Sequence, residues 1–171
     1  MSGDSTTVEL RAFEPGQHID LLRHWLGMPH VQCWWGEGPV ALEESRTHPP
    51  DQHAIITANG VPVGYLRWQR PTPRELAEAG LKDLPDALMD VDILIGEPSA
   101  TGRGIGPRAL GLLVERLGHD PDLAWLGLGS SLRNRRAIRA WEKAGFALFK
   151  VFQDSEIGPA VYLTRPLRTN G

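Results

Sequence analysis

The stretch from Val91 to Leu117 constrains the fold most, because it joins a buried strand to a helix through a glycine-rich loop. Val91, Ile93, Leu94 and Ile95 are apolar and mostly β-branched, which is typical of a buried strand. Glycines and a proline interrupt any regular element between positions 96 and 106. Apolar residues then return at helical spacing, so a helix is expected over 106–117.

A strand, a glycine-rich loop and a helix start in this order favour an anion site, because free N–H groups and the positive end of the helix dipole point at the ligand. The spacing excludes two phosphate motifs. Gly102-Arg-Gly104-Ile-Gly106 is followed by Pro107-Arg-Ala, which breaks the dinucleotide fingerprint, and no Gly-Lys-Ser/Thr is present for a P-loop. From these residues alone, the loop fits either an anion cradle or a capped surface loop.

Length and composition indicate one domain over residues 1–171, with 1–6 flexible. The hydrophobic share of 41% and the net charge of −3 give no support for nucleic-acid binding. No apolar run approaches the length of a membrane span, and the N-terminus lacks the features of a signal peptide. The single cysteine, Cys33, excludes an internal disulfide, so we expect a cytoplasmic protein.

Strands are expected over 8–13, 53–57, 63–69, 89–95, 125–128, 147–153 and 160–167, and helices over 19–26, 40–46, 74–79, 106–117 and 134–144. Asn59-Gly60 predicts a hairpin turn. Ser130 or Ser131 is expected to help cap the helix 134–144, which would bury Ile138 and Trp141. This order predicts an α/β (α+β) fold with a mixed sheet and helices on both faces; a doubly wound sheet is the alternative.

Three features together resemble the GCN5-related N-acetyltransferase (GNAT) superfamily. Thr101-Gly-Arg-Gly-Ile-Gly106 after Asp92-Ile-Leu-Ile is similar to its acetyl-CoA pyrophosphate loop. Asn134 to Phe146 is similar to its Asn-x-x-Ala-x-x-x-Tyr-x-x-x-Gly-Phe motif, and the order of elements matches across the chain. The resemblance implies a mostly antiparallel sheet splayed at its central strand, acetyl-CoA as cosubstrate, and acetyl transfer to a primary amine.

The resemblance also implies which residues bind acetyl-CoA. Backbone N–H groups of Ile93, Leu94 and Ile95 would meet the oxyanion and the pantetheine. The pyrophosphate would lie on Thr101, Gly102, Arg103, Gly104, Ile105 and Gly106, with Asn134 as a further contact. The family usually has Gln or Arg at position 101, so Thr101 removes one side-chain contact.

Asp92 is the predicted catalytic carboxylate. A carboxylate among the apolar residues of a central strand costs free energy, so its presence there indicates a functional role. It would bind the substrate ammonium and accept its proton, directly or through water. Asp90 shares its face by strand alternation and would add charge. The other interpretation is a solvated carboxylate.

Trp141 stands where the family has the Tyr that protonates the leaving thiolate, and an indole N–H is not a practical acid. Trp141 is therefore expected to pack between helix and sheet, and the thiolate to leave unassisted or with help from another group. Trp34 and Trp35 are candidates for a wall of the acceptor site, and we expect one of them to lie in the core and the other in the site. Glu37, Asp154 and Glu156 are candidates for a negative rim, with Asp154 as a substrate contact.

Within the superfamily the chain most resembles aminoglycoside 6′-N-acetyltransferases, through the segment around Trp34-Trp35-Gly36 and through Gly158-Pro-Ala-Val-Tyr162. The implied acceptor is the 6′-amine of an aminoglycoside. Two departures from those enzymes leave the identity of the acceptor open. Gly129-Ser130-Ser131 stands where they have an acidic residue, and the segment 71–85 differs from theirs. The alternatives are a siderophore-biosynthesis hydroxylysine N-acyltransferase and a catalytically silent acyl-CoA-binding module. No metal, nucleic acid or membrane partner is expected, and monomer and homodimer are both open.

Overall fold

A computed structural model describes residues 5–36 and 38–169. The strands are β1 Val8–Ala12, β2 His53–Ala58, β3 Val61–Gln69, β4 Leu88–Ile95, β5 Trp125–Ser131, β6 Ala147–Asp154 and β7 Gly158–Pro166. The helices are α1 Pro15–Leu26, α2 Pro29–Trp35, α3 Gly38–Thr47, α4 Pro73–Ala79, α5 Ile105–Leu117 and α6 Arg135–Lys143, with 3₁₀ turns η1 Pro50–Gln52 and η2 Pro98–Ala100.

The strands form a seven-stranded sheet in the order β1-β2-β3-β4-β5-β7-β6. β1 pairs with β2, β2 with β3, β5 with β7, and β6 with β7, all antiparallel. β4 and β5 are parallel, with a register from Leu88↔Trp125 to Asp90↔Gly127. The mixed, mostly antiparallel sheet confirms the predicted fold class.

The chain divides into two compact units. Unit 1 comprises Met1–Arg67 and Ile93–Leu112, and unit 2 comprises Trp68–Asp92 and Leu113–Gly171. β3, β4 and α5 each begin in one unit and end in the other. Asp92 and Ile93 are therefore consecutive residues of one strand that belong to different units.

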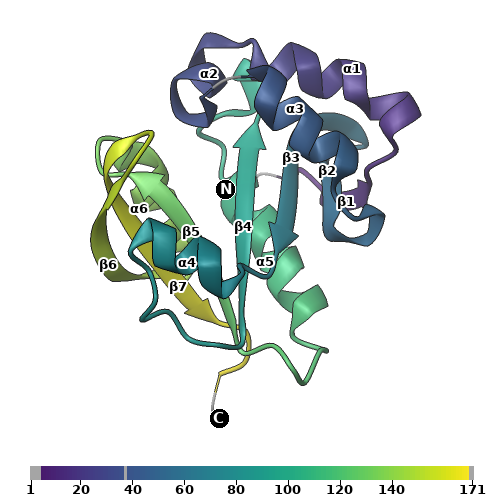
Figure 1. The fold of residues 1–171 in the computed structure, drawn as a ribbon. Helices are drawn as coiled ribbons and strands as arrows, with labels where there is room; N and C mark the ends of the chain where they lie inside the picture. The colour runs from purple at the N-terminus through teal and green to yellow at the C-terminus, as the bar shows by residue number, and fades with distance from the viewer. Residues whose placement is uncertain (1–4, 37, 170–171) are drawn as a thin grey trace. The chain divides into compact units, whose positions relative to one another are not determined.

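In unit 1, helices α1, α2 and α3 lie together beside β1, β2 and β3, in purple and blue (Figure 1). Their apolar side chains form one cluster with the strands. Its buried members are Phe13, Leu22, Trp25, Leu26, Val31, Ala41, Ile55, Tyr65 and Leu94. The turn between β2 and β3 has positive φ at both Asn59 and Gly60, as the Asn-Gly pair predicts.

Helix α2 is an element that the sequence analysis did not predict. It has seven residues, which is too short for a periodic apolar pattern. Pro29 at its first position supplies a helical φ and needs no hydrogen-bond donor there. Gly36 then ends it with φ 68° and ψ −139°, a conformation that glycine adopts at little cost.

A polar group is enclosed within the apolar core of unit 1. His53 is 3% exposed, and its Nδ1 lies 3.0 Å from the Tyr65 hydroxyl. Its ring contacts Phe13 at 4.5 Å and His48 at 5.4 Å between centroids. Burial, together with the charges of His48 and Arg67, lowers the pKa of His53 to about 4, so the ring is neutral near pH 7.

In unit 2, β5, β7 and β6 lie side by side in green to yellow, with α6 beside them (Figure 1). Thr72 and Glu75 form a capping box that begins α4. The segment after α4 is tied to β6, because Lys150 Nζ donates to Gly80 O at 2.9 Å and lies 3.1 Å from Asp83 Oδ1.

Two expectations for α6 were wrong in detail. Its cap is Asn134, whose side chain accepts from Ala137 N at 3.3 Å, while Ser131 Oγ accepts from Arg133 N in the preceding turn. The helix has no fully buried residue: Ile138 and Trp141 are only half-buried. The predicted face is correct, since Ile138 and Trp141 are less exposed than Arg135, Arg136, Arg139 and Glu142.

Two expectations lie partly outside the described residues: residues 1–4 of the segment 1–6 that was expected to be flexible, and Glu37 of the predicted negative rim. Thr6 is 5% exposed, so residue 6 is packed. No helix within 5–36 or 38–169 is long and apolar enough to cross a membrane.

Candidate active site

The glycine-rich loop lies between the end of β4 and the start of α5, in unit 1. Gly102 and Gly104 have φ of 72° and 74°, the left-handed region that favours glycine. A Cβ added at Gly104 would meet nothing within 4 Å, so the space beside the backbone is open. Ile105 is 1% exposed and anchors the first turn of the helix in the core. This geometry offers backbone N–H groups at a helix start to an anion.

Side chains of the loop also hold it in shape. Thr101 Oγ1 donates to Pro98 O at 2.7 Å, which closes the 3₁₀ turn η2 onto the loop. Arg103 is exposed, and its guanidinium donates to Thr6 Oγ1 at 3.4 Å. Arg103 therefore links the loop to the start of the chain while its cation stays at the surface.

The end of β4 is held from several sides within unit 1. Leu94 is 5% exposed in the core, whereas Ile93 and Ile95 are half-buried. The Ile95 carbonyl accepts from His30 Nε2 at 3.0 Å. A Cβ at Gly64 would lie 2.4 Å from Leu94 O, so only glycine lets β3 approach this closely.

The residue after β4 packs against α1. A Cβ at Gly96 would lie 2.0 Å from Trp25 Cγ. The indole N–H of Trp25 donates to Glu97 Oε1 at 2.9 Å. The backbone that carries the predicted oxyanion and pantetheine contacts is thus fixed by close packing and by hydrogen bonds.

The two tryptophans predicted for the acceptor site, Trp34 and Trp35, are the last two residues of helix α2. Trp34 is 41% exposed. Trp35 is half-buried and packs against the apolar cluster of unit 1. Cys33, just before them, is an exposed free thiol. His30 at the other end of α2 binds the Ile95 carbonyl, so this helix and the end of β4 are directly connected.

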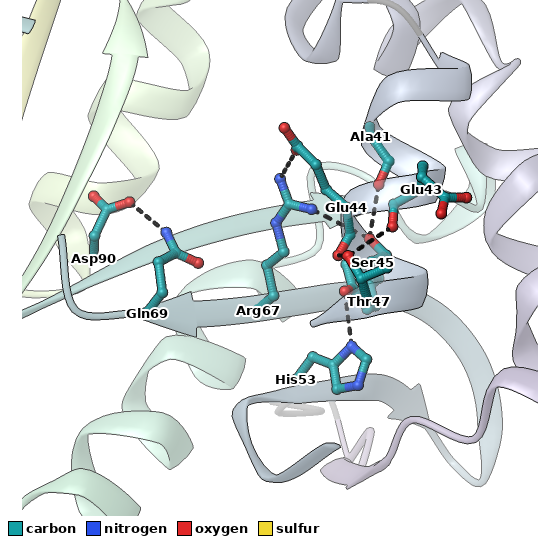
Figure 2. A network of polar contacts seen from close by, with 10 residues as sticks. Ala41, Glu43, Glu44, Ser45, Thr47, His53, Arg67, Gln69 and Asp90 are labelled. Carbon is teal, nitrogen blue, oxygen red and sulfur yellow. Dashed lines mark hydrogen bonds and ion pairs between the residues drawn. The ribbon is translucent and has the colours of Figure 1, made fainter. Parts of the chain in front are cut away.

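Arg67 on β3 is the centre of a polar network in unit 1 (Figure 2). Its guanidinium donates to Glu44 Oε2 at 2.8 Å and to Ser45 Oγ at 3.3 Å. The Arg67 Cζ lies 5.5 Å from the centroid of the Trp35 ring. A buried arginine thus contacts both α2 and α3.

In unit 2, both oxygens of Asp90 are occupied. The Tyr162 hydroxyl donates to Oδ1 at 2.6 Å, and Gln69 Nε2 donates to Oδ2 at 2.7 Å; Figure 2 shows the latter contact. Tyr162 lies over Gly127, where a Cβ would be 2.5 Å from the hydroxyl oxygen. Burial first, and then the charges of Asp90 and Asp92, raise the pKa of Tyr162, which stays a neutral donor.

The remaining predicted site residues of unit 2 have different surroundings. Asp92 is half-buried, and its charge acts on Tyr162. Asn134 uses its side-chain oxygen to cap α6. Asp154 Oδ1 accepts from Glu156 N at 2.8 Å and Ile157 N at 3.0 Å, which shapes the turn between β6 and β7. Unit 1 thus contains the loop, the end of β4 and the tryptophans, and unit 2 contains Asp92, Asn134 and Asp154.

Three residues with structural roles in the site were missed or underused by sequence reasoning. Arg67 carried a signal, because a charged residue stood within the otherwise apolar run Tyr65-Leu-Arg-Trp68. Tyr162 and His30 gave none, since a tyrosine in a strand and a scattered histidine are ordinary. No group of three or more His, Cys, Asp or Glu side chains in the described ranges is arranged to hold a metal ion.

A strand, an open glycine loop and a helix, set in a mixed sheet with this order, define an acetyltransferase of the GNAT fold. A family model of the acetyltransferase (GNAT) domain matches residues 14–154, and the chain belongs to this family.

Curated relatives and solved structures extend this likeness to most of the chain. The aminoglycoside N(6′)-acetyltransferase type 1 of Klebsiella pneumoniae is 28% identical over 186 residues, which cover 96% of this chain and 84% of the relative. A structure of AAC(6′)-Ib with ribostamycin and coenzyme A superposes with a TM-score of 0.79 and 27% identity, covering 96% of this chain and 98% of the other. A structure of the same enzyme with coenzyme A and kanamycin has a TM-score of 0.78 and 27% identity, covering 94% and 95% of the two chains.

Proposed function

We propose that this protein transfers an acetyl group from acetyl-CoA to a primary amine, with the 6′-amine of an aminoglycoside as preferred acceptor. The observation that carries this proposal is the likeness, over 94% of the chain, to an enzyme whose structure holds coenzyme A and kanamycin. In the reaction the amine nitrogen bonds to the thioester carbonyl carbon, the C–S bond breaks, and the amine loses a proton.

The residues of unit 1 fit the proposed acetyl-CoA site. The open glycine loop would hold the pyrophosphate on N–H groups from Gly102 to Gly106, with Arg103 adding charge. Backbone groups of Ile93 to Ile95 would hold the pantetheine and stabilise the oxyanion, since they lie on a strand end fixed by its neighbours. Asn134 would contact the cosubstrate through its amide N–H group.

Asp92 is the proposed proton acceptor, and it also orients the substrate ammonium. It is half-buried, where a carboxylate interacts with a cation more strongly than in bulk water. Trp141 supplies no acid at neutral pH, so we expect the thiolate to leave as the anion. Trp34 and Trp35 would form the aromatic wall of the acceptor site, with Asp154 adding negative charge.

A CoA-release assay tests the proposal. Turnover with kanamycin or tobramycin is expected, and turnover with N6-hydroxylysine alone would assign the chain to siderophore biosynthesis. Tight acetyl-CoA binding without turnover of any amine would leave a silent acyl-CoA-binding module. A chain that did not bind acetyl-CoA would contradict all three functions.

The Asp92→Asn variant tests the proposed base. We expect its kcat to fall by about 10²–10⁴-fold, the usual contribution of general-base catalysis. The acetyl-CoA dissociation constant, measured by calorimetry, is expected to stay within about twofold, because the proposed cosubstrate contacts are unchanged. An equal loss of turnover and of acetyl-CoA affinity would contradict the role given to Asp92.

A further inference from the structure

Arg67 is a charged side chain that the proposed chemistry does not use. It lies in β3, where every residue from Val63 to Trp68 is buried, and it is itself 9% exposed. Burying a guanidinium is costly unless strong partners replace its water shell. The contacts of Arg67 therefore indicate its role in the protein.

The hydrogen-bond partners of Arg67 lie on α3. Glu44 accepts at 2.8 Å and supplies the opposite charge. Ser45 is 1% exposed and donates its own proton to Ala41 O at 3.0 Å, so its lone pairs are available to accept from Arg67. Figure 2 shows the guanidinium reaching both residues from β3. The planar fork of arginine suits two acceptors at once, which a lysine does not match.

The third partner of Arg67 lies on α2. The guanidinium carbon is 5.5 Å from the centroid of the Trp35 ring, within the range of a cation–π contact. Residues 36 and 37 lie between Trp35 and the start of α3, and the backbone conformation of Gly36 does not continue α2. Arg67 thus contacts both sides of this junction and fixes the end of α2 relative to α3.

Helix α2 is then held at both ends. His30 near its start binds the Ile95 carbonyl of β4, and Trp35 at its end contacts Arg67 of β3. Trp34 lies between these two anchors and is 41% exposed. Trp34 is thus an exposed residue of a helix that is anchored near both of its ends.

We propose that Arg67 is a positioning residue for acceptor binding, which acts by holding Trp35 and the end of α2 so that Trp34 faces the acceptor. The inference rests on the proposed function, because it takes the two tryptophans as the acceptor wall. Glu44 matches the charge of Arg67, so this positioning is compatible with a cationic acceptor. The acetyl-CoA contacts proposed for the glycine loop do not include Arg67.

Arg67→Lys is the main test, with Arg46→Met as matched control. Arg46 pairs with Glu43 at 3.4 Å on the same helix α3, but its side chain is 47% exposed. For Arg67→Lys we expect KM for kanamycin to rise roughly tenfold, the equivalent of losing one hydrogen bond between charged groups. We expect kcat and the acetyl-CoA dissociation constant to change by less than about threefold. Arg46→Met is expected to behave as the unaltered protein.

A double-variant cycle shows whether Arg67 acts through Trp35. In a Trp35→Leu background, Arg67→Lys is expected to raise KM much less than in the unaltered protein. Equal effects in both backgrounds would overturn the inference, and so would an unchanged KM or a parallel loss of acetyl-CoA affinity.

A fluorine NMR spectrum of protein labelled with 5-fluorotryptophan needs no acceptor. The six tryptophan resonances are assigned by single Trp→Phe variants. Arg67→Lys is expected to shift or broaden the signals of Trp34 and Trp35, and Arg46→Met to leave them in place. If the unaltered protein does not acetylate kanamycin, the proposed function fails, but the spectrum still tests the role of Arg67. Changed Trp34 and Trp35 signals support the positioning by Arg67, and unchanged signals overturn it.

Discussion

The surroundings of His53 disfavour the protonated form of its ring. It is 3% exposed, and its pKa of about 4 lies well below the ordinary value of 6.5. Between these two pH values the unfolded chain binds a proton that the folded protein does not. The stability contributed by neutral His53 is therefore fully present above pH 6.5 and is lost as the pH falls toward 4.

Replacing His53 is expected to flatten the acid limb of the stability profile. The free energy of unfolding of the unaltered protein should fall between pH 7 and pH 4.5, and His53→Gln should remove up to about 3 kcal/mol of that fall. Urea denaturation at a series of pH values measures this. His24→Gln replaces an exposed histidine and serves as control. An unchanged acid limb in His53→Gln would show that other groups dominate.

Two glycines give opposite expectations for the same substitution. At Gly96 a new Cβ would overlap the Trp25 ring, whereas at Gly111, within α5, it would meet nothing within 4 Å. We expect Gly96→Ala to destabilise by about 1–3 kcal/mol or more through overpacking. Gly111→Ala should stabilise by about 0.5–1 kcal/mol, as is usual inside a helix. Chemical denaturation of both variants checks the contrast, and a loss of stability at both positions would refute it.

At the scale of elements, β4 and β7 are joined across β5 by the contact between Tyr162 and Asp90. We expect Tyr162→Phe to destabilise by about 1.5–3 kcal/mol, the cost of losing a hydrogen bond to a charged group. In a double-mutant cycle with Asp90→Asn, the two losses should couple by at least about 1 kcal/mol. Additive losses in urea denaturation would mean that the contact contributes little.

The strands and long helices could be predicted because their signals are local. β-branched runs bounded by turn residues marked the strands, and helical spacing of apolar residues marked α5. Helix α2 could not be predicted, since seven residues between a proline and a glycine form a helix here only with the support of the cluster around Trp25 and Val31. Intrinsic preference alone does not favour so short a helix.

The candidate site follows the same rule. Gly102 and Gly104 were identified because glycines between a strand and a helix form a pattern that is visible within a short stretch of sequence. The contacts of Arg67 with Glu44 and Trp35 join distant parts of the sequence, and they depend on packing that no local pattern encodes. The hydrogen bond between Tyr162 and Asp90 was unpredictable for the same reason, although Asp90 itself was singled out.

At the scale of the whole molecule, the proposed acetyl-CoA site predicts ligand-dependent stability. At a concentration one hundred times Kd, a ligand that binds only the folded state adds about 2.7 kcal/mol. Acetyl-CoA should therefore raise Tm and slow amide exchange over 102–106. Gly104→Ala, which places a side chain at a φ of 74°, should reduce the shift in Tm, and Gly111→Ala should not. A Tm that does not respond to acetyl-CoA would contradict the site.

The exposed thiol of Cys33 has a practical consequence. Since the chain has one cysteine, a thiol-reactive fluorophore or spin label attaches at a single defined position without any substitution. That position immediately precedes Trp34 on α2. A labelled protein therefore carries a spectroscopic reporter beside the proposed acceptor wall, and a titration with candidate amines can rank them by affinity before any of them is tested for turnover.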